Sequence, residues 1–205
     1  MKNMKNMKNN ITNYINNNII KKINPIYFFS IFIIFIVTIA YNNNRYYEYL
    51  PTIPLYPNNY EEVKEVEDYI NKRDSEMYQF IKLTDKSCIY AFKDLVNEDL
   101  NSLNNISSKI KNNILFFKYL FNRERPYQTN PNLNKYSSIS SHSPSFPSGH
   151  AMQGQYLAKI LSKKYPEKKE LLYKIGIKCG MARVYAGLHF PSDVKLGQFL
   201  VNILP

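Results

Sequence analysis

Four residues, Pro147-Ser148-Gly149-His150, stand directly before an amphipathic pattern that predicts a helix. Glycine allows close backbone approach to a ligand, and the first N–H groups of a helix are unpaired and lie at its positive end. Such a turn suits an anion, to which Ser148 can offer its hydroxyl and backbone N–H, Gly149 its N–H and His150 a titratable ring. An ordinary helix start followed by a surface histidine can have the same sequence. This stretch alone therefore does not distinguish an anion-binding turn from a structural one.

A second histidine, His189, stands two residues before Pro191, and proline is favoured in the first turn of a helix. Asp193 follows four residues after the histidine, so its carboxylate can reach one imidazole nitrogen across the helix start. That hydrogen bond would fix the tautomer and leave the other nitrogen as a nucleophile or base. The spacing is common by itself, and a hydrogen-bonded surface pair is the alternative.

Three basic residues could complete such a site. Lys118 and Arg125 lie seven residues apart in KYLFNRERP, near the end of another predicted helix, and Arg183 lies six residues before His189. Spread over the surface, they would be ordinary solvated charges. Converged on the Ser-Gly turn, they would form a cage for a tetrahedral dianion.

Together these residues resemble the three-part signature of the phosphatidic acid phosphatase type 2 and vanadium haloperoxidase superfamily. The three parts are Lys118-x6-Arg125-Pro126, Pro147-Ser148-Gly149-His150 and Arg183-x5-His189-x3-Asp193. Their order and every spacing agree with the family pattern over residues 118–193. The stretch YLPTIPLYP, with the helical pattern after it, is similar to the start of the class A nonspecific acid phosphatases. Ala182 departs from the pattern, because the family usually has serine before this arginine.

The resemblance implies a phosphatase that needs neither metal nor cofactor. His189 would attack phosphorus and form a phosphohistidine, with Asp193 stabilising the imidazolium, while His150 would protonate the leaving alkoxide and later activate water. The phosphate-binding residues would be Lys118, Arg125, Ser148, Gly149 and Arg183. The expected partners are a phosphate monoester substrate and inorganic phosphate or vanadate. The third histidine, His142, is expected to be a solvated side chain in a serine-rich loop.

Two other functions are open at this point. The same cage could hold vanadate in a haloperoxidase, or Ala182 could mark a catalytically silent phosphate-binding protein. A lipid phosphate is a further substrate class if the chain lies beside a membrane.

The elements that must position these residues are predicted to be helices throughout. Apolar residues recur at helical spacing in residues 58–83, 85–103 and 107–126, and no alternating strand pattern persists. Further helices are expected from about His150 to Lys164, from about Glu167 to Tyr185, and, as a short last one, from near Pro191. Residues 127–146 are polar and lack a period, which is typical of a functional or disordered loop. The predicted fold class is all-α, a compact helical bundle of the acid phosphatase and haloperoxidase type.

The N-terminal region differs in composition. Residues 1–25 are low-complexity, rich in Asn and Lys and free of acidic residues, so nothing in them would pack. Residues 26–41 are uncharged and follow basic residues, which predicts the core of a signal peptide or a single membrane anchor. Either would make residues 42–205 a phosphatase domain that is secreted, periplasmic or luminal, or held at a membrane by one segment. The motif helices carry too many charges to span a bilayer.

The net charge of +11 comes from lysines that are scattered rather than clustered, which argues against a nucleic-acid surface. Two cysteines, Cys88 and Cys179, could form a disulfide in an oxidising compartment. Both lie in apolar helical patterns and could equally be packed thiols. The spacing of two cysteines gives no geometry, so the sequence leaves this open.

Overall fold

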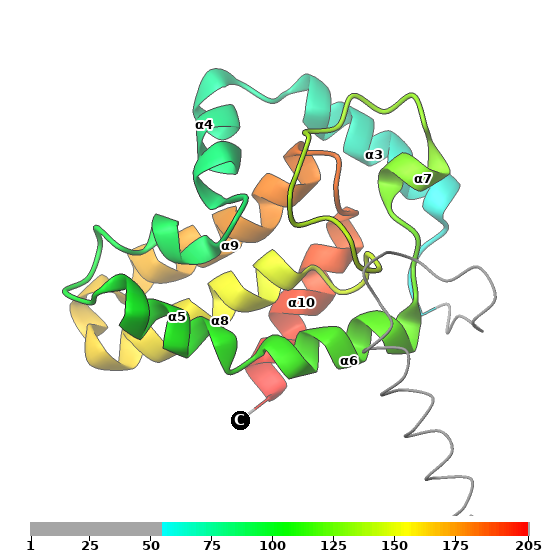
Figure 1. Cartoon of the computed structure of the whole chain (residues 1–205). Coiled ribbons are helices and arrows are strands. Elements are labelled where there is room, and N and C mark those ends of the chain that lie inside the picture. Colours follow the sequence, from blue (N-terminus) through cyan, green and yellow to red (C-terminus); the bar gives the residue numbers. More distant parts are fainter. Residues whose placement is uncertain (1–54, 205) are drawn as a thin grey trace, which may run out of the picture. The chain divides into compact units, whose positions relative to one another are not determined.

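A computed structural model describes residues 55–204, and these residues form helices without a strand (Figure 1). The helices are α3 (Asn59–Asn71), α4 (Ser75–Thr84), α5 (Leu100–Ser108), α6 (Lys111–Phe121), α7 (Pro126–Thr129), α8 (Gly149–Lys164), α9 (Lys169–Tyr185) and α10 (Pro191–Ile203). Two short 3-10 helices are η2 (Cys88–Ala91) and η3 (Pro166–Lys168). The predicted all-α class is confirmed. The predicted tail and the apolar segment 26–41 lie outside the described residues.

Two helix predictions differ from the structure for local reasons. The pattern over residues 58–83 forms two helices, because the Asp74 side chain accepts a hydrogen bond from the Met77 N–H at 2.7 Å and caps a new start. The helix expected over 85–103 is wrong. Its first part is only the short η2, and α5 begins after Asp99, whose side chain accepts from the Ser102 N–H at 2.7 Å.

Helix α8 is the central element, packed against α5, α6, α9, α10 and η2. It runs antiparallel to α9, and the two backbones approach each other closely at Gly154 and Gly176. A Cβ atom on Gly154 would lie 2.8 Å from the Gly176 carbonyl oxygen, so only hydrogen fits there. Because the helices are antiparallel, the start of α8 and the end of α9 lie at the same end of the pair. His150 and Arg183 both contact Asp85 there: Nε2 of His150 lies 3.3 Å from its backbone oxygen, and Nη2 of Arg183 lies 3.0 Å from its Oδ1.

The two cysteines are free thiols, both fully buried in one apolar cluster with residues such as Phe92 and Leu161. A hydrogen bond with Cys88, together with burial, raises the pKa of the Cys179 thiol well above its usual value. The Cys88 thiol in turn donates to the carbonyl oxygen of His150 at 3.4 Å. The cysteines therefore pack beneath the first turn of α8. Within residues 55–204, no helix is both long and apolar enough to cross a membrane.

Candidate active site

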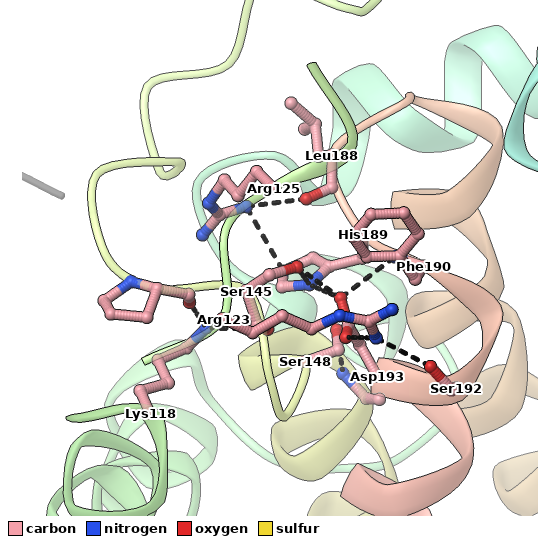
Figure 2. Close-up of polar contacts among 12 residues, drawn as sticks. Lys118, Arg123, Arg125, Ser145, Ser148, Leu188, His189, Phe190, Ser192 and Asp193 are labelled. Atoms are coloured by element: carbon pink, nitrogen blue, oxygen red, sulfur yellow. Dashed lines mark hydrogen bonds and ion pairs between the residues drawn. The ribbon is translucent and has the colours of Figure 1, made fainter. Parts of the chain in front are cut away.

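His189 and Asp193 form a buried hydrogen-bonded pair at the start of α10 (Figure 2). Nδ1 of His189 lies 2.9 Å from Oδ2 of Asp193. The same oxygen accepts a hydrogen bond from the backbone N–H of Phe190 at 2.9 Å and another from the hydroxyl of Ser145. A carboxylate can only accept, so Nδ1 of His189 carries the hydrogen and Nε2 keeps its lone pair.

The other ring nitrogen of His189, Nε2, carries no hydrogen and faces a cation. It lies 3.4 Å from Nη1 of Arg125. Burial lowers the pKa of His189 well below its usual value, and the charges of Arg125, Lys118 and Arg183 lower it further. The ring is therefore neutral near neutral pH, as a nitrogen nucleophile must be.

Lys118 and Arg125 are buried, and apart from the contact between Arg125 and His189 their side-chain hydrogen bonds go to backbone carbonyls. Nζ of Lys118 lies 2.5 Å from the oxygen of Pro144. Arg125 donates to the carbonyls of Ser143 and Leu188, each at 2.8 Å. Among residues 55–204, no ion pair joins Lys118 or Arg125 to a carboxylate.

Burial and neighbouring positive charges disfavour the charged forms of Lys118 and Arg125. Burial lowers the pKa of Arg125 to about 10, with the nearby charge of Arg183 acting in the same direction. Burial also lowers the pKa of Lys118 well below its usual value, and the charge of Arg125 adds to this. An anion beside them would relieve both effects.

Arg183, near the end of α9, uses only part of its donors within residues 55–204. Its Nη2 atom lies 3.0 Å from Oδ1 of Asp85, and it also donates to the hydroxyls of Ser138 at 2.8 Å and Ser140 at 3.1 Å. Its Nε and Nη1 atoms are buried and have no hydrogen-bond partner among the described residues. Burial raises the pKa of Asp85, but hydrogen bonds from Ser138 and the Ile139 N–H, with the charge of Arg183, outweigh it and leave the pKa lowered.

The Ser-Gly turn at the start of α8 fits the prediction in part. The Ser148 hydroxyl oxygen accepts a hydrogen bond from the Ala151 N–H at 3.4 Å and caps α8. The backbone N–H of Ser148 donates to the carbonyl of Asp193 at 2.9 Å, so this donor, which was expected to face an anion, is engaged within the protein. Gly149 is the first residue of α8, and its N–H lies among those that a helix leaves without an intrahelical acceptor.

His150 contacts backbone oxygens rather than an acid. Its Nε2 atom lies 3.0 Å from the Thr84 carbonyl oxygen and 3.3 Å from that of Asp85. Because carbonyls only accept, Nε2 carries a hydrogen. Burial lowers the pKa of His150 to about 3, and the charge of Arg183 contributes. His150 is therefore neutral in the ligand-free protein.

The polar segment over residues 127–146 was predicted to be a loop throughout, but its first three residues lie in α7. The remainder of this loop contacts the basic residues of the candidate site. Its residues 143–145 provide carbonyls for Lys118 and Arg125, and its serines at 138 and 140 hold Arg183. His142 in this loop is exposed, as expected. Ala182 is fully buried in an apolar cluster with Ile81 and Leu188, where a serine hydroxyl would need a partner of its own.

Sequence reasoning missed four buried residues that contact the expected ones: Glu62, Asp85, Arg123 and Ser145. Arg123 and Ser145 lie close in sequence to residues that were predicted to form the site. Their side chains point inward because of local backbone turns. Glu62 and Asp85 lie in a charged helix and at a helix end, where solvated carboxylates are the rule. No sequence signal separated them from their neighbours.

Comparison with known proteins agrees with the resemblance in the sequence. The family model described as PAP2 superfamily matches residues 103–201. A non-specific acid phosphatase of Salmonella typhimurium is 41% identical over 56 residues, which are 27% of this chain and 22% of that protein. One of Providencia stuartii is 36% identical over 58 residues, 28% of this chain and 23% of that protein. The chain thus spans about a fifth of the length of the curated relatives it matches.

Among solved structures, a transmembrane PAP2-type phosphatidylglycerolphosphate phosphatase from Bacillus subtilis is similar with a TM-score of 0.48 and 20% sequence identity. The similarity covers 85% of this chain and 92% of that one. The family predicted from the three-part signature is confirmed by the matching family model. The residues matched by the PAP2 superfamily model, 103–201, contain every residue of that signature.

Proposed function

We propose that this protein hydrolyses phosphate monoesters through a phosphohistidine on His189, with cationic side chains in place of a metal. The observation that carries the proposal is Arg183, whose buried Nε and Nη1 atoms lack partners. Nη1 of Arg125 lies 3.4 Å from Nε2 of His189, and the charge of Arg183 lowers the pKa of Lys118, Arg125 and His189. A dianion with tetrahedral oxygens fits these donors.

Burial makes this arrangement costly without a ligand. A buried charge without a partner typically costs several kcal/mol, and an unsatisfied buried donor about 1–3 kcal/mol. Lys118 and Arg125 have no carboxylate partner among residues 55–204, and Arg183 pairs with Asp85 but keeps two unsatisfied donors. Folding stability does not favour such a cluster, but phosphate binding does. This supports an anion site over a set of structural ion pairs.

In the first half-reaction, the Nε2 lone pair of His189 attacks phosphorus and the bond to the ester oxygen breaks. Asp193 stabilises the imidazolium that forms, because its carboxylate accepts the Nδ1 hydrogen. Lys118, Arg125 and Arg183, with the N–H of Gly149 and the hydroxyl of Ser148, stabilise the equatorial oxygens.

His150 supplies the proton that the leaving oxygen takes. In the ligand-free protein it is neutral, so this proton arrives with the substrate as its monoanion, or is taken up when the phosphoryl charge raises the pKa of His150. In the second half-reaction, neutral His150 removes a proton from water, which attacks the phosphohistidine and releases phosphate.

Turnover of p-nitrophenyl phosphate by the purified full chain tests the proposal. We expect hydrolysis that persists in EDTA and is inhibited by vanadate, an analogue of the five-coordinate state. Loss in EDTA with recovery by Zn²⁺ or Mg²⁺ would contradict it. Phosphate binding without turnover would indicate the silent protein, and halide oxidation with added vanadate the haloperoxidase. A panel that includes lipid phosphates then addresses the natural substrate.

A further inference from the structure

Arg123 is a fully buried arginine that lies beside the cage but makes different contacts. Helix α6 ends at Asn122 in a left-handed conformation (φ 46°), and the chain turns inward directly after it. Every nitrogen of the Arg123 guanidinium is used: Nε donates to Asn59 at 2.8 Å, Nη1 to Ser192 and Asp193 at 2.7 Å each, and Nη2 to Glu62 at 2.8 Å and the Pro57 carbonyl at 3.4 Å. It has no donor left for phosphate.

Three aromatic rings hold this guanidinium in place. Its Cζ atom lies 3.9 Å from the ring centroid of Phe190, 4.5 Å from that of Tyr56 and 5.6 Å from that of Phe146. Rings at these distances favour a cation and restrict its movement. Arg123 is therefore a fixed group, unlike Arg183, which keeps two unpartnered nitrogens.

Arg123 joins two buried carboxylates. Its salt bridge to Asp193 involves Oδ1, whereas His189 uses Oδ2 of the same carboxylate (Figure 2). Its second salt bridge reaches Glu62 on α3, which also accepts from the N–H of Ser192 at 2.7 Å. Arg123 thus determines which oxygen of Asp193 faces the imidazole, and it neutralises a carboxylate pair that would otherwise repel.

We propose that Arg123 is a positioning residue for the Asp193–His189 pair, with Glu62 as its anchor on α3. The inference rests on the proposed role of His189 as nucleophile. Arg123 acts through Asp193 and does not touch the phosphoryl group. Its removal therefore affects the chemical step more than substrate binding.

Steady-state kinetics of Arg123→Met, Glu62→Gln and the double variant test this. We expect Arg123→Met to lower kcat about 10- to 100-fold, the range typical of groups that orient a ligand or base, while KM changes less than threefold. The double variant should be faster than Arg123→Met, because Glu62→Gln removes the second uncompensated carboxylate. Arg73→Met removes a partly exposed arginine that donates to the Tyr185 carbonyl at 3.3 Å and lies over the Tyr78 ring. This control variant should match the wild type.

A purely structural role predicts another pattern. In that case the double variant would be as slow as, or slower than, Arg123→Met, and the proposal would be overturned. If Arg123→Met does not fold, Arg123→Lys serves instead, because it keeps the charge and loses the two-pronged contact. It should lower kcat about tenfold, and wild-type kinetics in Arg123→Lys would overturn the proposal equally.

A measurement without turnover separates this inference from the proposed function. In ¹⁵N NMR of the imidazole, wild-type His189 should be the Nδ1–H tautomer, and Arg123→Met or Arg123→Lys should shift it toward a mixture of tautomers. If the variants show this tautomer change and the wild type has no phosphatase activity, the proposed function is refuted and the positioning role is supported. Unchanged His189 signals in a folded variant would refute the positioning role, whatever the wild-type activity.

Discussion

Nδ1 of His189 lies 2.9 Å from Oδ2 of Asp193, whereas Nε2 of His150 lies 3.0 Å from the backbone oxygen of Thr84. One ring is thus oriented by a carboxylate and the other by neutral carbonyls. A carboxylate stabilises an imidazolium strongly, and a carbonyl does so weakly. This asymmetry supports different roles for two histidines that the sequence presents alike.

Trapping of the covalent intermediate distinguishes the two roles. His150→Ala should still form phosphoenzyme from p-nitrophenyl phosphate, because a good leaving group needs little protonation, and hydrolysis should then stall for lack of a base. His189→Ala should form none, and Asp193→Asn should form it slowly. The measurement is a rapid quench that avoids acid, with labelled substrate, followed by peptide mapping. Label on His150, or equal labelling of wild type and His189→Ala, would reverse the assignment.

A second prediction concerns the anion-binding donors of Arg183. Two charge-assisted hydrogen bonds of about 1.5–3 kcal/mol each are at stake, so Arg183→Lys should weaken phosphate binding about 100-fold. Asp85→Asn should weaken it less, because Asp85 holds only the Nη2 atom of Arg183. Isothermal titration with inorganic phosphate measures both.

The matched control is Lys178→Met on the same helix, since Lys178 pairs with Glu76 on the surface. It should bind phosphate as the wild type does. Arg183→Lys keeps the net charge, whereas Lys178→Met lowers it by one. Wild-type phosphate binding in Arg183→Lys with weaker binding in Lys178→Met would show that only net charge matters, which would contradict a directed site.

The sequence indicates the residues of the candidate cage but not the residues that hold them in place. The spacing of Lys118, Arg125 and Arg183 to the histidines is readable in the sequence, and the charges of Arg125 and Arg183 both lower the pKa of buried Lys118. Arg123 stands two residues before Arg125, and only the left-handed turn at Asn122 directs it toward Asp193 instead of the site. A one-dimensional pattern does not contain this turn, because asparagine adopts it only sometimes.

The boundaries of the helix predicted over residues 85–103 were wrong for a similar reason. Apolar spacing at residues 85–103 identified buried Cys88 and Phe92 but not the path of the chain between them and α5. The carbonyls of Thr84 and Asp85 at the end of α4 orient His150, and backbone acceptors leave no trace in side-chain types. The sequence therefore gave no sign of what would contact the second histidine.

A third prediction concerns stability in acid. An unfolded chain protonates its histidines near pH 6.5, whereas folded His150 has a pKa of about 3 and that of His189 is also lowered. Between these values the unfolded state binds more protons, so the free energy of unfolding should fall as the pH falls below about 6.5. The expected slope is on the order of 1 kcal/mol per pH unit for each histidine.

Thermal unfolding at several pH values measures this slope. His150→Asn should reduce it, and the exposed His142→Ala should not. Phosphate should raise Tm, because it binds only the folded protein. Equal slopes in wild type and His150→Asn would contradict the neutral state of His150.

The last prediction concerns the alkaline limb of kcat/KM. The pKa of His150 is lowered to about 3 and that of His189 is also lowered well below its usual value, so the reactive combination at mildly acidic pH is neutral histidines and monoanionic ester. The rate should then fall as the substrate, not the protein, loses its proton, and phosphate monoesters do so near pH 6. An aryl ester such as p-nitrophenyl phosphate loses this proton at lower pH than an alkyl ester. The alkaline limb should therefore lie at lower pH for the aryl substrate, by the difference between the two second pKa values. A limb at the same pH for both would mean that a group on the protein titrates there, which would require His150 to be protonated before substrate binds.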